Sequence, residues 1–354
     1  MRRLLILAIA VLAVLGMLTG CTRRQTSETP AMDQGPAAQL RLGYLPNITH
    51  AAALIGVERG LLAGQLGTTA LSAQTFNAGP DEVNALLGGS LDAAFLGPGP
   101  AISAFSRSGG EAVRLVAGVA SGGVQLVVRP EITALGQLAG CRIATPQLAN
   151  TQDIALKTWL AGQRLPTGAE PGDVQVINID NAQAVNAYRT GQLDGGWLPE
   201  PYTSRLVAES GAHVLVDEAS LWPDGRFPTT VLIVRTQYLQ QHPQTVAALL
   251  RGLLQAEDYA RADPTGAKAA ANSALGKAAG KPLAQPVLDR AWSNITITTD
   301  PLAARFPRLA ADAVTAGVAA SAPDLHGFVD LGPLNTVLTA AGRPPVDAAG
   351  LDRR

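Results

Sequence analysis

Short apolar runs alternate with segments of helical pattern from Leu40 onward. A first series of strand candidates covers residues 41–44, 69–71, 93–96 and 114–117, and a second covers residues 142–145, 174–177, 195–198 and 213–216. This alternation is typical of α/β proteins, in which crossover helices connect the strands of a sheet. Helical patterns follow at residues 246–260, 268–275, 287–292 and 302–320, and we expect their apolar faces to pack outside the first series.

The two series match each other at an offset of about one hundred residues. Val83-Asn84-Ala85 recurs as Val185-Asn186-Ala187, and Gly89-Ser90-Leu91-Asp92 recurs as Gly191-Gln192-Leu193-Asp194. Each Gly-to-Asp segment precedes a short apolar run and a proline-rich corner. Similar strand-and-turn sequences can also arise independently, so a convergent origin stays open. As a repeat, the match predicts two lobes of similar architecture.

Two further apolar runs, at residues 124–128 and 230–234, bracket the second series. We expect these runs to be crossover strands between the lobes. Lobe one then comprises residues 40–128 plus 235–354, and lobe two comprises residues 129–234. The predicted fold class is α/β with two mixed sheets flanked by helices, and with the C-terminal helices packed on lobe one.

The N-terminus has the pattern of a secretory signal. Arg2 and Arg3 precede an apolar stretch at residues 4–18, which ends in Leu18-Thr19-Gly20-Cys21. The stretch is shorter than the ~20 residues that a membrane span needs. Its last four residues resemble the bacterial lipobox, whose cysteine is acylated. We therefore expect residues 1–20 to be a lipoprotein signal peptide and Cys21 a lipid anchor outside the cytoplasm; an unlipidated cysteine beside an ordinary cleavage site is the alternative.

Residues 21–39 are rich in Thr, Ser, Pro, Gln and Ala and show no apolar period, so we expect a flexible tether. Removal of Arg2 and Arg3 reduces the 27 basic side chains to 25, against 28 acidic ones. No basic patch indicates a nucleic-acid partner. Cys141 has no partner once Cys21 is acylated, so the fold cannot depend on an internal disulfide, and we expect a buried thiol at a strand start.

The loops after the strands are the expected ligand site, because ligands of open α/β sheets bind beyond the carboxyl ends of the strands. Helix N-termini there offer unpaired N–H groups and a partial positive charge. In the first lobe the candidate loops are Pro46-Asn47-Ile48-Thr49-His50, Gly97-Pro98-Gly99-Pro100 and Ser121-Gly122-Gly123. Asn47 and Thr49 have the alternative role of capping a helix.

In the second lobe, residues 145–153 open a helix, and Asn150 with Asp153 has the shape of a capping box. Thr151 and Gln152 are expected to offer donors to the cleft. Glu200 is an acceptor for a ligand or for the opposite lobe, with a surface salt bridge as the alternative. Tyr44, Trp197 and Trp222 are aromatic candidates for the cleft wall, although packing in the core is the commoner role of such residues.

These segments resemble the ABC solute-binding family that serves aliphatic sulfonates, taurine and nitrate. The resemblance extends over residues 40–300 and rests on Gly43 to His50, Gly97 to Pro100, Ile143 to Gln147, Asn150 to Asp153, Trp197 to Pro201, Leu221 to Pro223 and Thr229-Thr230. It implies a type II periplasmic-binding-protein fold, a monomer that closes over its solute, and a permease with its ATPase as partners.

The same resemblance implies an aliphatic sulfonate as ligand, with oxygens held by Asn47, Thr49, Thr151 and the backbone near Gly99 and Gly122. Nitrate, taurine or a pyrimidine precursor of thiamine are the alternatives, and because no Arg or Lys lies in these loops, a neutral ligand stays open. The predicted ligand-binding set is Tyr44, Asn47, Thr49, His50, Gly97, Gly99, Ser121, Gly122, Thr145, Asn150, Thr151, Gln152, Trp197, Glu200 and Thr229.

Enzymatic activity is not expected. The chain has no G-x-S-x-G nucleophile elbow, no P-loop and no G-x-G-x-x-G after a strand. Its four histidines are scattered, so we predict no metal site and no cofactor. The pyrimidine synthases of thiamine biosynthesis resemble these binders but carry a cysteine cluster for iron, which Cys141 alone cannot supply. A sensory lipoprotein of the same fold is the remaining alternative to a transport component.

Overall fold

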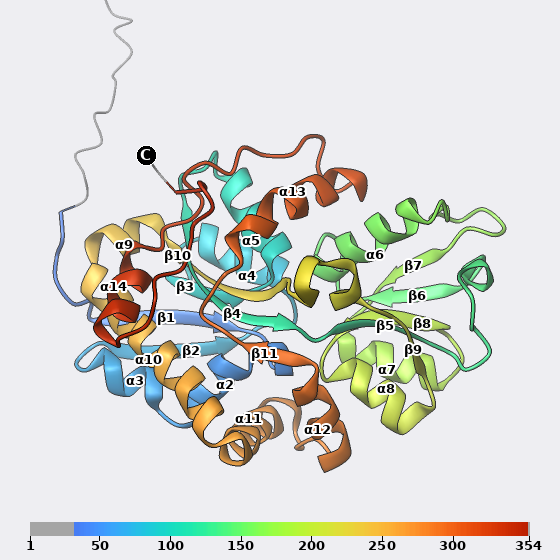
Figure 1. The fold of residues 1–354 in the computed structure, drawn as a ribbon, viewed down its shortest axis with the longest axis horizontal. Coiled ribbons are helices and arrows are strands. Elements are labelled where there is room, and N and C mark those ends of the chain that lie inside the picture. Colours follow the sequence, from blue (N-terminus) through green and yellow to red (C-terminus); the bar gives the residue numbers. More distant parts are fainter. Residues whose placement is uncertain (1–31, 353–354) are drawn as a thin grey trace, which may run out of the picture. The chain divides into compact units, whose positions relative to one another are not determined.

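Two mixed β-sheets carry the fold (Figure 1). The first sheet has the strand order β11-β4-β10-β3-β1-β2, and the second has the order β7-β6-β8-β5-β9. The computed structural model describes residues 32–352; the predicted signal peptide and Cys21 lie outside the described residues. The expected α/β class with two mixed sheets flanked by helices is confirmed.

The strands agree closely with the apolar runs of the sequence. The first sheet contains β1 (Gln39–Tyr44), β2 (Ala70–Thr75), β3 (Ala93–Leu96), β4 (Val113–Gly122), β10 (Pro228–Arg235) and β11 (Ile295–Ile297). The second contains β5 (Val124–Val128), β6 (Arg142–Thr145), β7 (Gln175–Asn178), β8 (Gly195–Pro199) and β9 (His213–Asp217). Every residue of β3, β4, β5 and β8 is buried, which explains why these strands are mainly apolar and do not alternate.

The helices follow the strands in chain order. The loops after the first three strands lead into a short 3-10 turn η1 (Ile48–His50), α2 (Ala51–Glu58), α3 (Leu61–Leu66), α4 (Gly79–Leu87) and α5 (Pro98–Arg107). Those of the second sheet lead into α6 (Thr151–Gly162), α7 (Asn181–Arg189) and α8 (Tyr202–Ser210). The C-terminal part contains α9 (Thr236–Gln241), α10 (Pro243–Ala262), α11 (Pro264–Ala279), α12 (Gln285–Ser293), α13 (Phe306–Thr315) and α14 (Gly332–Ala340).

The two sheets repeat one arrangement. β1 lies between the parallel strands β2 and β3, and β6 lies in the same way between β7 and β8. An antiparallel strand follows on the other side of the third strand, β10 beside β3 and β5 beside β8. The predicted two-lobed repeat is therefore confirmed in the order and direction of the strands.

The repeated Gly-to-Asp segments hold equivalent strands together in the two sheets. The Oδ2 atoms of Asp92 and Asp194 accept the backbone N–H of Arg41 (2.9 Å) and Arg142 (2.8 Å). The two guanidinium groups then donate to the carbonyls of Gly89 and Gly191. The aspartates thus join the first and third parallel strands of each lobe.

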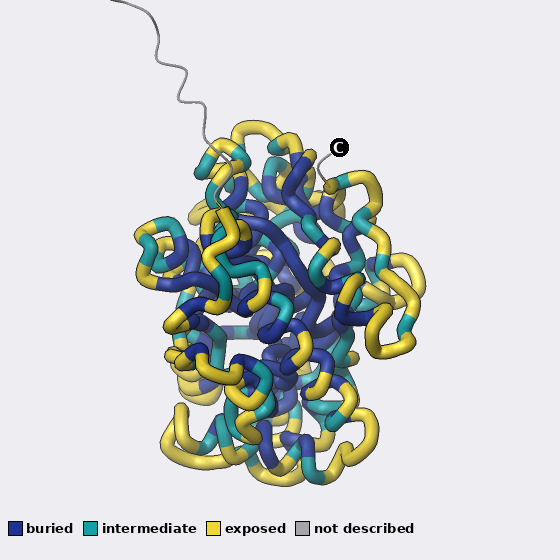
Figure 2. Tube along the Cα trace, turned by 90° about the vertical axis from the view of Figure 1, so that its left-hand side faces the viewer, coloured by how far each residue is buried: buried dark blue, intermediate teal, exposed yellow. Residues whose placement is uncertain are grey.

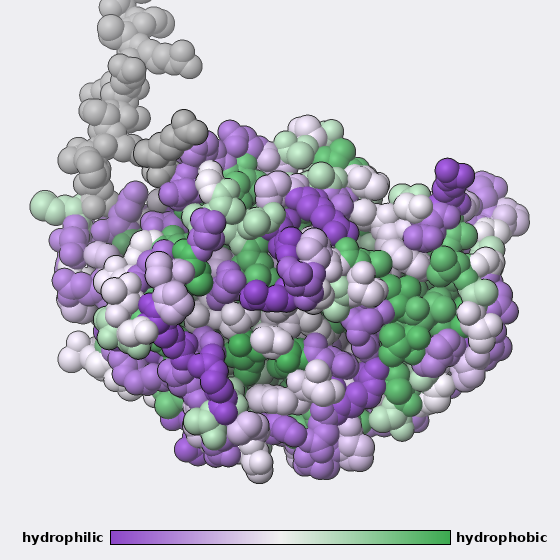
Figure 3. Space-filling model, in the orientation of Figure 1, coloured by the Kyte–Doolittle hydropathy of each residue, from purple (hydrophilic) through white to green (hydrophobic). Residues whose placement is uncertain are grey.

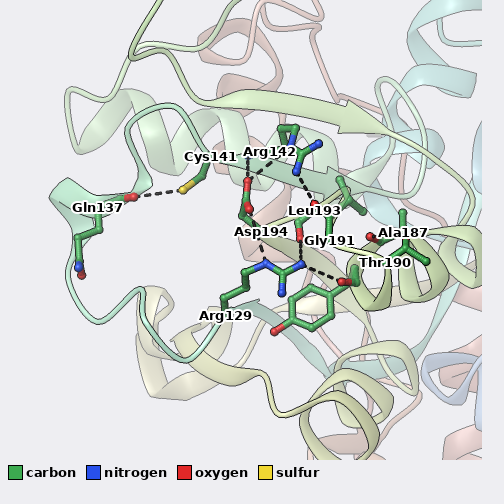
Figure 4. Close-up of polar contacts among 10 residues, drawn as sticks. Arg129, Gln137, Cys141, Arg142, Ala187, Thr190, Gly191, Leu193 and Asp194 are labelled. Atoms are coloured by element: carbon green, nitrogen blue, oxygen red, sulfur yellow. Dashed lines mark hydrogen bonds and ion pairs between the residues drawn. The ribbon is translucent and has the colours of Figure 1, made fainter.

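Figure 4 shows Asp194 between Arg129 and Arg142, with Cys141 at the edge of the same group. The thiol donates to the carbonyl of Gln137 at 3.1 Å. Cys141 is only partly buried, so the expectation of a buried thiol was too strong, although the residue does lie directly before β6.

The expected lobe boundaries differ from the points at which the chain changes sheet. β5 pairs with β8 and β9, so residues 124–128 belong to the second sheet. β10 pairs with β3 and β4, so residues 228–235 belong to the first. Both runs are buried at almost every residue, and burial alone does not reveal which neighbour a strand will pair with. We therefore propose that the lobes divide at Gly123 and in the segment between β9 and β10.

The N-terminal segment joins the body earlier than expected for a tether reaching residue 39. The Gln34 N–H donates to the Gln241 carbonyl, and the Ala37 N–H donates to Thr245 Oγ1. β1 itself begins at Gln39. Backbone hydrogen bonds thus hold residues 34–37 against the body, although this segment has no apolar period, and composition does not predict such bonds.

The C-terminal helices do not all pack on lobe one. α10, α11 and α14 contact elements of the first lobe, whereas α12 contacts α8 of the second, and α13 contacts both α5 of the first and α6 of the second. β11, which the sequence did not predict, pairs with β4 at residues 120–122. The C-terminal part therefore joins the two lobes on two sides.

Buried backbone runs through the strands, and exposed positions gather in the loops and on the outer helix faces (Figure 2). An apolar area is visible over the second lobe in Figure 3, where all five residues of β9 are only partly buried. No helix within residues 32–352 is long and apolar enough to cross a membrane.

The return crossover between β9 and β10 contains a buried carboxyl group. Glu218 is 3% exposed and accepts the indole N–H of Trp197 at 2.7 Å. Burial raises the pKa of Glu218 to about 7, although hydrogen bonds from the indoles of Trp197 and Trp222 lower it in part. Arg308 stacks over Trp222 at 3.9 Å from the ring centroid. The protonated carboxyl therefore suits this apolar crossover better than the charged form.

The raised pKa of Glu218 predicts that the crossover loses stability as pH rises. Protonation favours the folded state, so this contribution is complete below the ordinary pKa of 4.5 and is lost as pH rises through about 7. Glu218→Gln should raise the free energy of unfolding at pH 8 by roughly 1–3 kcal/mol, at about 1.4 kcal/mol per pKa unit, and change it little at pH 4.5. Urea denaturation at both pH values measures this, with the exposed-site variant Glu131→Gln as control; an equal effect at both pH values would contradict it.

Candidate functional site

A cavity lies where loops from the two lobes meet. Its lining consists of Leu45, Asn47, Thr49, His50, Asn77, Ala78, Gly79, Gly97, Pro100, Pro146, Asn150, Thr151, Gln152, Asn181, Pro199 and Thr229. These residues follow the carboxyl ends of the three parallel strands of each sheet, with Thr229 added from the start of β10. The interior volume is about 30 Å³. At ~10–15 Å³ for one water, the cavity in this closed arrangement holds two or three waters or a compact ion.

The loop after β1 supplies three buried polar side chains. Thr49 Oγ1 donates to Asn47 Oδ1 at 2.7 Å, so neither side chain caps the helix, contrary to the alternative considered above. The Nδ2 group of Asn47 has no partner among the described residues and remains able to donate. The first-lobe wall therefore presents an amide donor to the cavity.

His50 is neutral in this site. Burial lowers the pKa of His50 to about 3. Its Nδ1 accepts the backbone N–H of Leu45 at 3.3 Å, which in the neutral ring places the proton on Nε2. The imidazole is thus a donor without a charge.

The loops after β2 and β3 bring backbone to the cavity. Ala78 is the N-cap residue of α4, and Gly97 is the N-cap residue of α5. Both helices carry proline in their first turn, where the missing N–H costs nothing. Asn77 adds an amide side chain from the loop before α4.

The second lobe contributes the N-termini of α6 and α7 to the cavity lining. Asn150 Oδ1 caps α6 by accepting the N–H of Asp153 at 2.8 Å, as the capping-box pattern predicted. The return half of the box is absent, since Asp153 Oδ2 accepts from Ala149 N–H at 2.9 Å instead. Asp180 caps α7, and Asn181 is the first residue of that helix.

The lining contains no charged side chain. Five helices, α2, α4, α5, α6 and α7, begin at it with the positive ends of their dipoles, although Asp180 accepts two of the first N–H groups of α7 and the first N–H of α2 bonds to the Ile48 carbonyl. The neutral His50 and the amide groups add further donors. An anion is therefore stabilised here by hydrogen bonds and dipoles and not by a counter-ion. Within residues 32–352, no cluster of three or more His, Cys, Asp and Glu side chains could hold a metal ion.

The lobes touch each other on two sides of the cavity. Gly99 N–H donates to Thr151 Oγ1 at 3.2 Å, and Ile48 N–H donates to the Glu200 carbonyl at 3.0 Å. A Cβ atom on Gly97 would overlap Thr151 Oγ1. The glycines of this loop thus allow α5 of one lobe to approach α6 of the other.

Glu200 is buried and joins the lobes instead of contacting the cavity. Its Oε1 accepts from Arg290 (3.1 Å) and from Asn294 Nδ2 (2.6 Å), and its Oε2 accepts from Ser204 N–H (3.1 Å). The salt bridge considered above is present, between Glu200 and Arg290, but it does not lie on the surface, because Glu200 is 0% exposed. Arg290 belongs to α12, so this carboxylate attaches the C-terminal helices to the second lobe.

Eight members of the predicted set line the cavity, namely Asn47, Thr49, His50, Gly97, Asn150, Thr151, Gln152 and Thr229. Their contact with a ligand remains a prediction. Tyr44, Gly99, Ser121, Gly122, Thr145, Trp197 and Glu200 do not line it.

Each of these seven has a structural role. Ser121 Oγ accepts from Phe227 N–H, and the Gly122 carbonyl accepts from Thr229 Oγ1, so both join β4 to β10. Thr145 donates to Asp153 at 3.1 Å and orients α6. Trp197 is 0% exposed and contacts Trp159 in the core, while Trp222 stacks on Phe227. Tyr44 is the last residue of β1, and its carbonyl accepts from Phe76 N–H.

The sequence analysis missed Asn77, Asn181 and Arg290. Asn77 and Asn181 follow β2 and β7, the second parallel strand of each lobe. Ligands of open α/β sheets bind beyond the carboxyl ends of the strands, and this rule applies to the loops after β2 and β7 as well. The two loops are also equivalent positions of the repeat. Arg290 lies on an exterior-type amphipathic helix, so no signal in the sequence marked it.

A β-carbon at residue 97 should prevent the closed arrangement. Gly97→Ala is expected to lower ligand affinity at least tenfold, because the methyl group meets Thr151 Oγ1 although the backbone φ of −72° accepts alanine. Calorimetric titration with whichever anion binds the parent measures the loss. Gly64→Ala is the matched control, since a β-carbon there meets nothing; equal affinity of Gly97→Ala and the parent would contradict the closed geometry.

Comparison with known proteins identifies the family. The NMT1-like family model matches residues 33–275. The taurine-binding periplasmic protein of Escherichia coli (strain K12) is 29% identical over 192 residues, which cover 53% of this chain and 57% of that protein. The bicarbonate-binding protein CmpA of Synechococcus sp. is 24% identical over 248 residues, 62% of this chain and 53% of that protein. The chain thus aligns with little more than half the length of these two relatives.

A solved structure shows the same fold. The alkanesulfonate-binding protein SsuA from Xanthomonas axonopodis pv. citri, bound to MOPS, gives a TM-score of 0.65 at 22% identity, over 81% of this chain and 95% of that one. The predicted type II periplasmic-binding-protein fold is thereby confirmed. Because the family model covers well over half of the sequence, this chain belongs to the NMT1-like family.

Proposed function

We propose that this protein is the extracytoplasmic solute-binding component of an ABC importer and that it binds a small oxyanion between its lobes. The observation that carries the proposal is the uncharged, donor-rich cavity at the N-termini of five helices. The taurine-binding, bicarbonate-binding and alkanesulfonate-binding names of the similar proteins all describe small oxyanions. Cys21 would anchor the protein to the membrane beside its permease and ATPase.

The available interactions suffice for physiological affinity. Each helix end contributes ~0.3–2 kcal/mol toward an anion, and a hydrogen bond to a charged group ~1.5–3 kcal/mol. Micromolar binding requires about 8 kcal/mol. Two or three helix ends and two side-chain donors, such as Asn47 and Thr151, reach this value.

The cavity favours a compact ligand. Its closed volume of about 30 Å³ suits an oxyanion with four or five heavy atoms. The aliphatic sulfonate expected from the sequence fits best when its alkyl part is short, and longer sulfonates require wider separation of the lobes. The small volume equally favours bicarbonate or nitrate, which are the second candidates.

Binding without catalysis is the function that the site supports. The lining offers no carboxylate and no thiol, and its one imidazole has a pKa of about 3, so no general acid and base pair faces the cavity. A transport role is distinguished from a sensory one by uptake of the bound solute in cells with and without the protein.

Thr151 should be required for anion binding. We expect one or more of methanesulfonate, taurine, bicarbonate and nitrate to stabilise the protein, by ~2.7 kcal/mol at a hundredfold excess over Kd. Thr151→Val should weaken that ligand about tenfold because it removes a donor, while Thr151→Ser retains the hydroxyl and the affinity. Thermal-shift and calorimetric titrations measure both effects. A protein that none of these anions stabilises, but that a neutral pyrimidine does, would contradict the proposal.

A further inference from the structure

Asn181 lines the cavity with a buried amide oxygen that has no donor among the described residues. It is the first residue of α7 and is 6% exposed. Its Oδ1 atom is sealed from solvent and accepts no hydrogen bond within the described part of the chain. The capping role at this helix already belongs to Asp180, which accepts from Ala182 and Gln183 N–H. The Asn181 side chain is therefore not needed to complete the helix.

Two other amide oxygens of the lining are satisfied within the protein. Asn47 Oδ1 accepts from Thr49, and Asn150 Oδ1 accepts from Asp153 N–H. Thr229 and Thr151 likewise have partners, in the Gly122 carbonyl and in Gly99 N–H. Buried polar atoms without a partner are uncommon in native proteins because their lost hydration is not recovered. An isolated acceptor at a ligand cavity is explained when the ligand brings the donor.

We propose that the physiological ligand carries an N–H or O–H group that donates to Asn181 Oδ1, in addition to the oxyanion that the helix N-termini hold. This inference rests on the proposed function and narrows it. The ligand class is a protonated oxyanion such as bicarbonate, or an oxyanion with an amino or hydroxyl group such as an aminoalkanesulfonate. Anions that can only accept hydrogen bonds, such as nitrate, leave Asn181 unpaired and bind more weakly.

Two matched pairs of probes isolate the donor. Bicarbonate and nitrate are planar monoanions with four heavy atoms, and only bicarbonate has an O–H group. Taurine and 1-propanesulfonate share one skeleton length, and taurine differs in its ammonium group, which supplies N–H donors together with a positive charge, so bicarbonate and nitrate are the pair that isolates the donor. We expect the parent protein to bind the donor-bearing member of at least one pair ten to a hundred times more tightly, which calorimetry under identical buffer and pH measures.

Asn181→Leu tests the residue itself. Leucine has a similar volume and no acceptor. In the pair that the parent discriminates, the ratio of the two Kd values should therefore fall to within threefold of one. The affinity for the donor-free member of that pair should change less than threefold. Asn186→Leu is the matched control: it is the same substitution on an exposed face of α7 and should leave the ratio unchanged. Thermal unfolding without ligand shows whether either variant is folded.

Asn181→Asp provides a second measurement. It keeps the acceptor and adds a negative charge, so nitrate and propanesulfonate should lose at least tenfold in affinity while taurine, through its ammonium group, loses less. Equal binding within both pairs by the parent would overturn the inference but leave the oxyanion function standing. So would a uniform loss for all four anions in Asn181→Leu. Failure of every anion to bind the parent would instead remove the proposed function itself.

Discussion

The direction of the strands is the constraint on which the rest of the structure depends. In each sheet three parallel strands end at the same edge, so the helices that follow them must begin there. The two lobes place these edges against each other, and the N-termini of α2, α4, α5, α6 and α7 meet around one cavity. The partial positive charge around the cavity is thus a consequence of the sheet topology. The side chains of the lining add individual hydrogen-bond donors and acceptors to it.

The repeat was predictable because each copy is a short continuous segment, whereas the bonds of its aspartates span 51 and 52 residues and were not predicted. Asp92 and Asp194 each follow a glycine turn and precede a buried strand, and the same spacing recurs about one hundred residues later. Their carboxylates bind the backbone of the first parallel strand in both lobes. Capping of α6 by Asn150 was predictable for the same reason, since the donor lies three residues away.

Contacts between distant segments were not predictable. The sheet to which β5 and β10 belong depends on pairing partners, and both strands are buried at almost every residue, so no period distinguishes the alternatives. The partner of Glu200 lies ninety residues away on α12, and nothing in the pattern around Arg290 indicates an inward guanidinium. The position of Glu200 beside cavity-lining Pro199 made a ligand contact the simpler hypothesis, whereas the fold uses its carboxylate to attach the C-terminal part.

The lining can stabilise an anion only if the negative charge of the nearby Asp153 carboxylate is balanced by other groups. Asp153 lies in the first turn of α6 and would repel an anion from the helix N-terminus if its charge were unbalanced. Its Oδ1 accepts from Thr145 and Asn178, and its Oδ2 accepts from Lys157 at 2.8 Å. The Lys157 charge cancels that of Asp153 from the side away from the cavity, so the dipole and the free N–H groups of α6 remain directed at the ligand. An anion is therefore attracted by partial charges that are fixed in position. Selectivity among anions then depends on side-chain groups that the protein leaves without a partner within residues 32–352, such as the hydroxyl proton of Thr151 and the Oδ1 atom of Asn181.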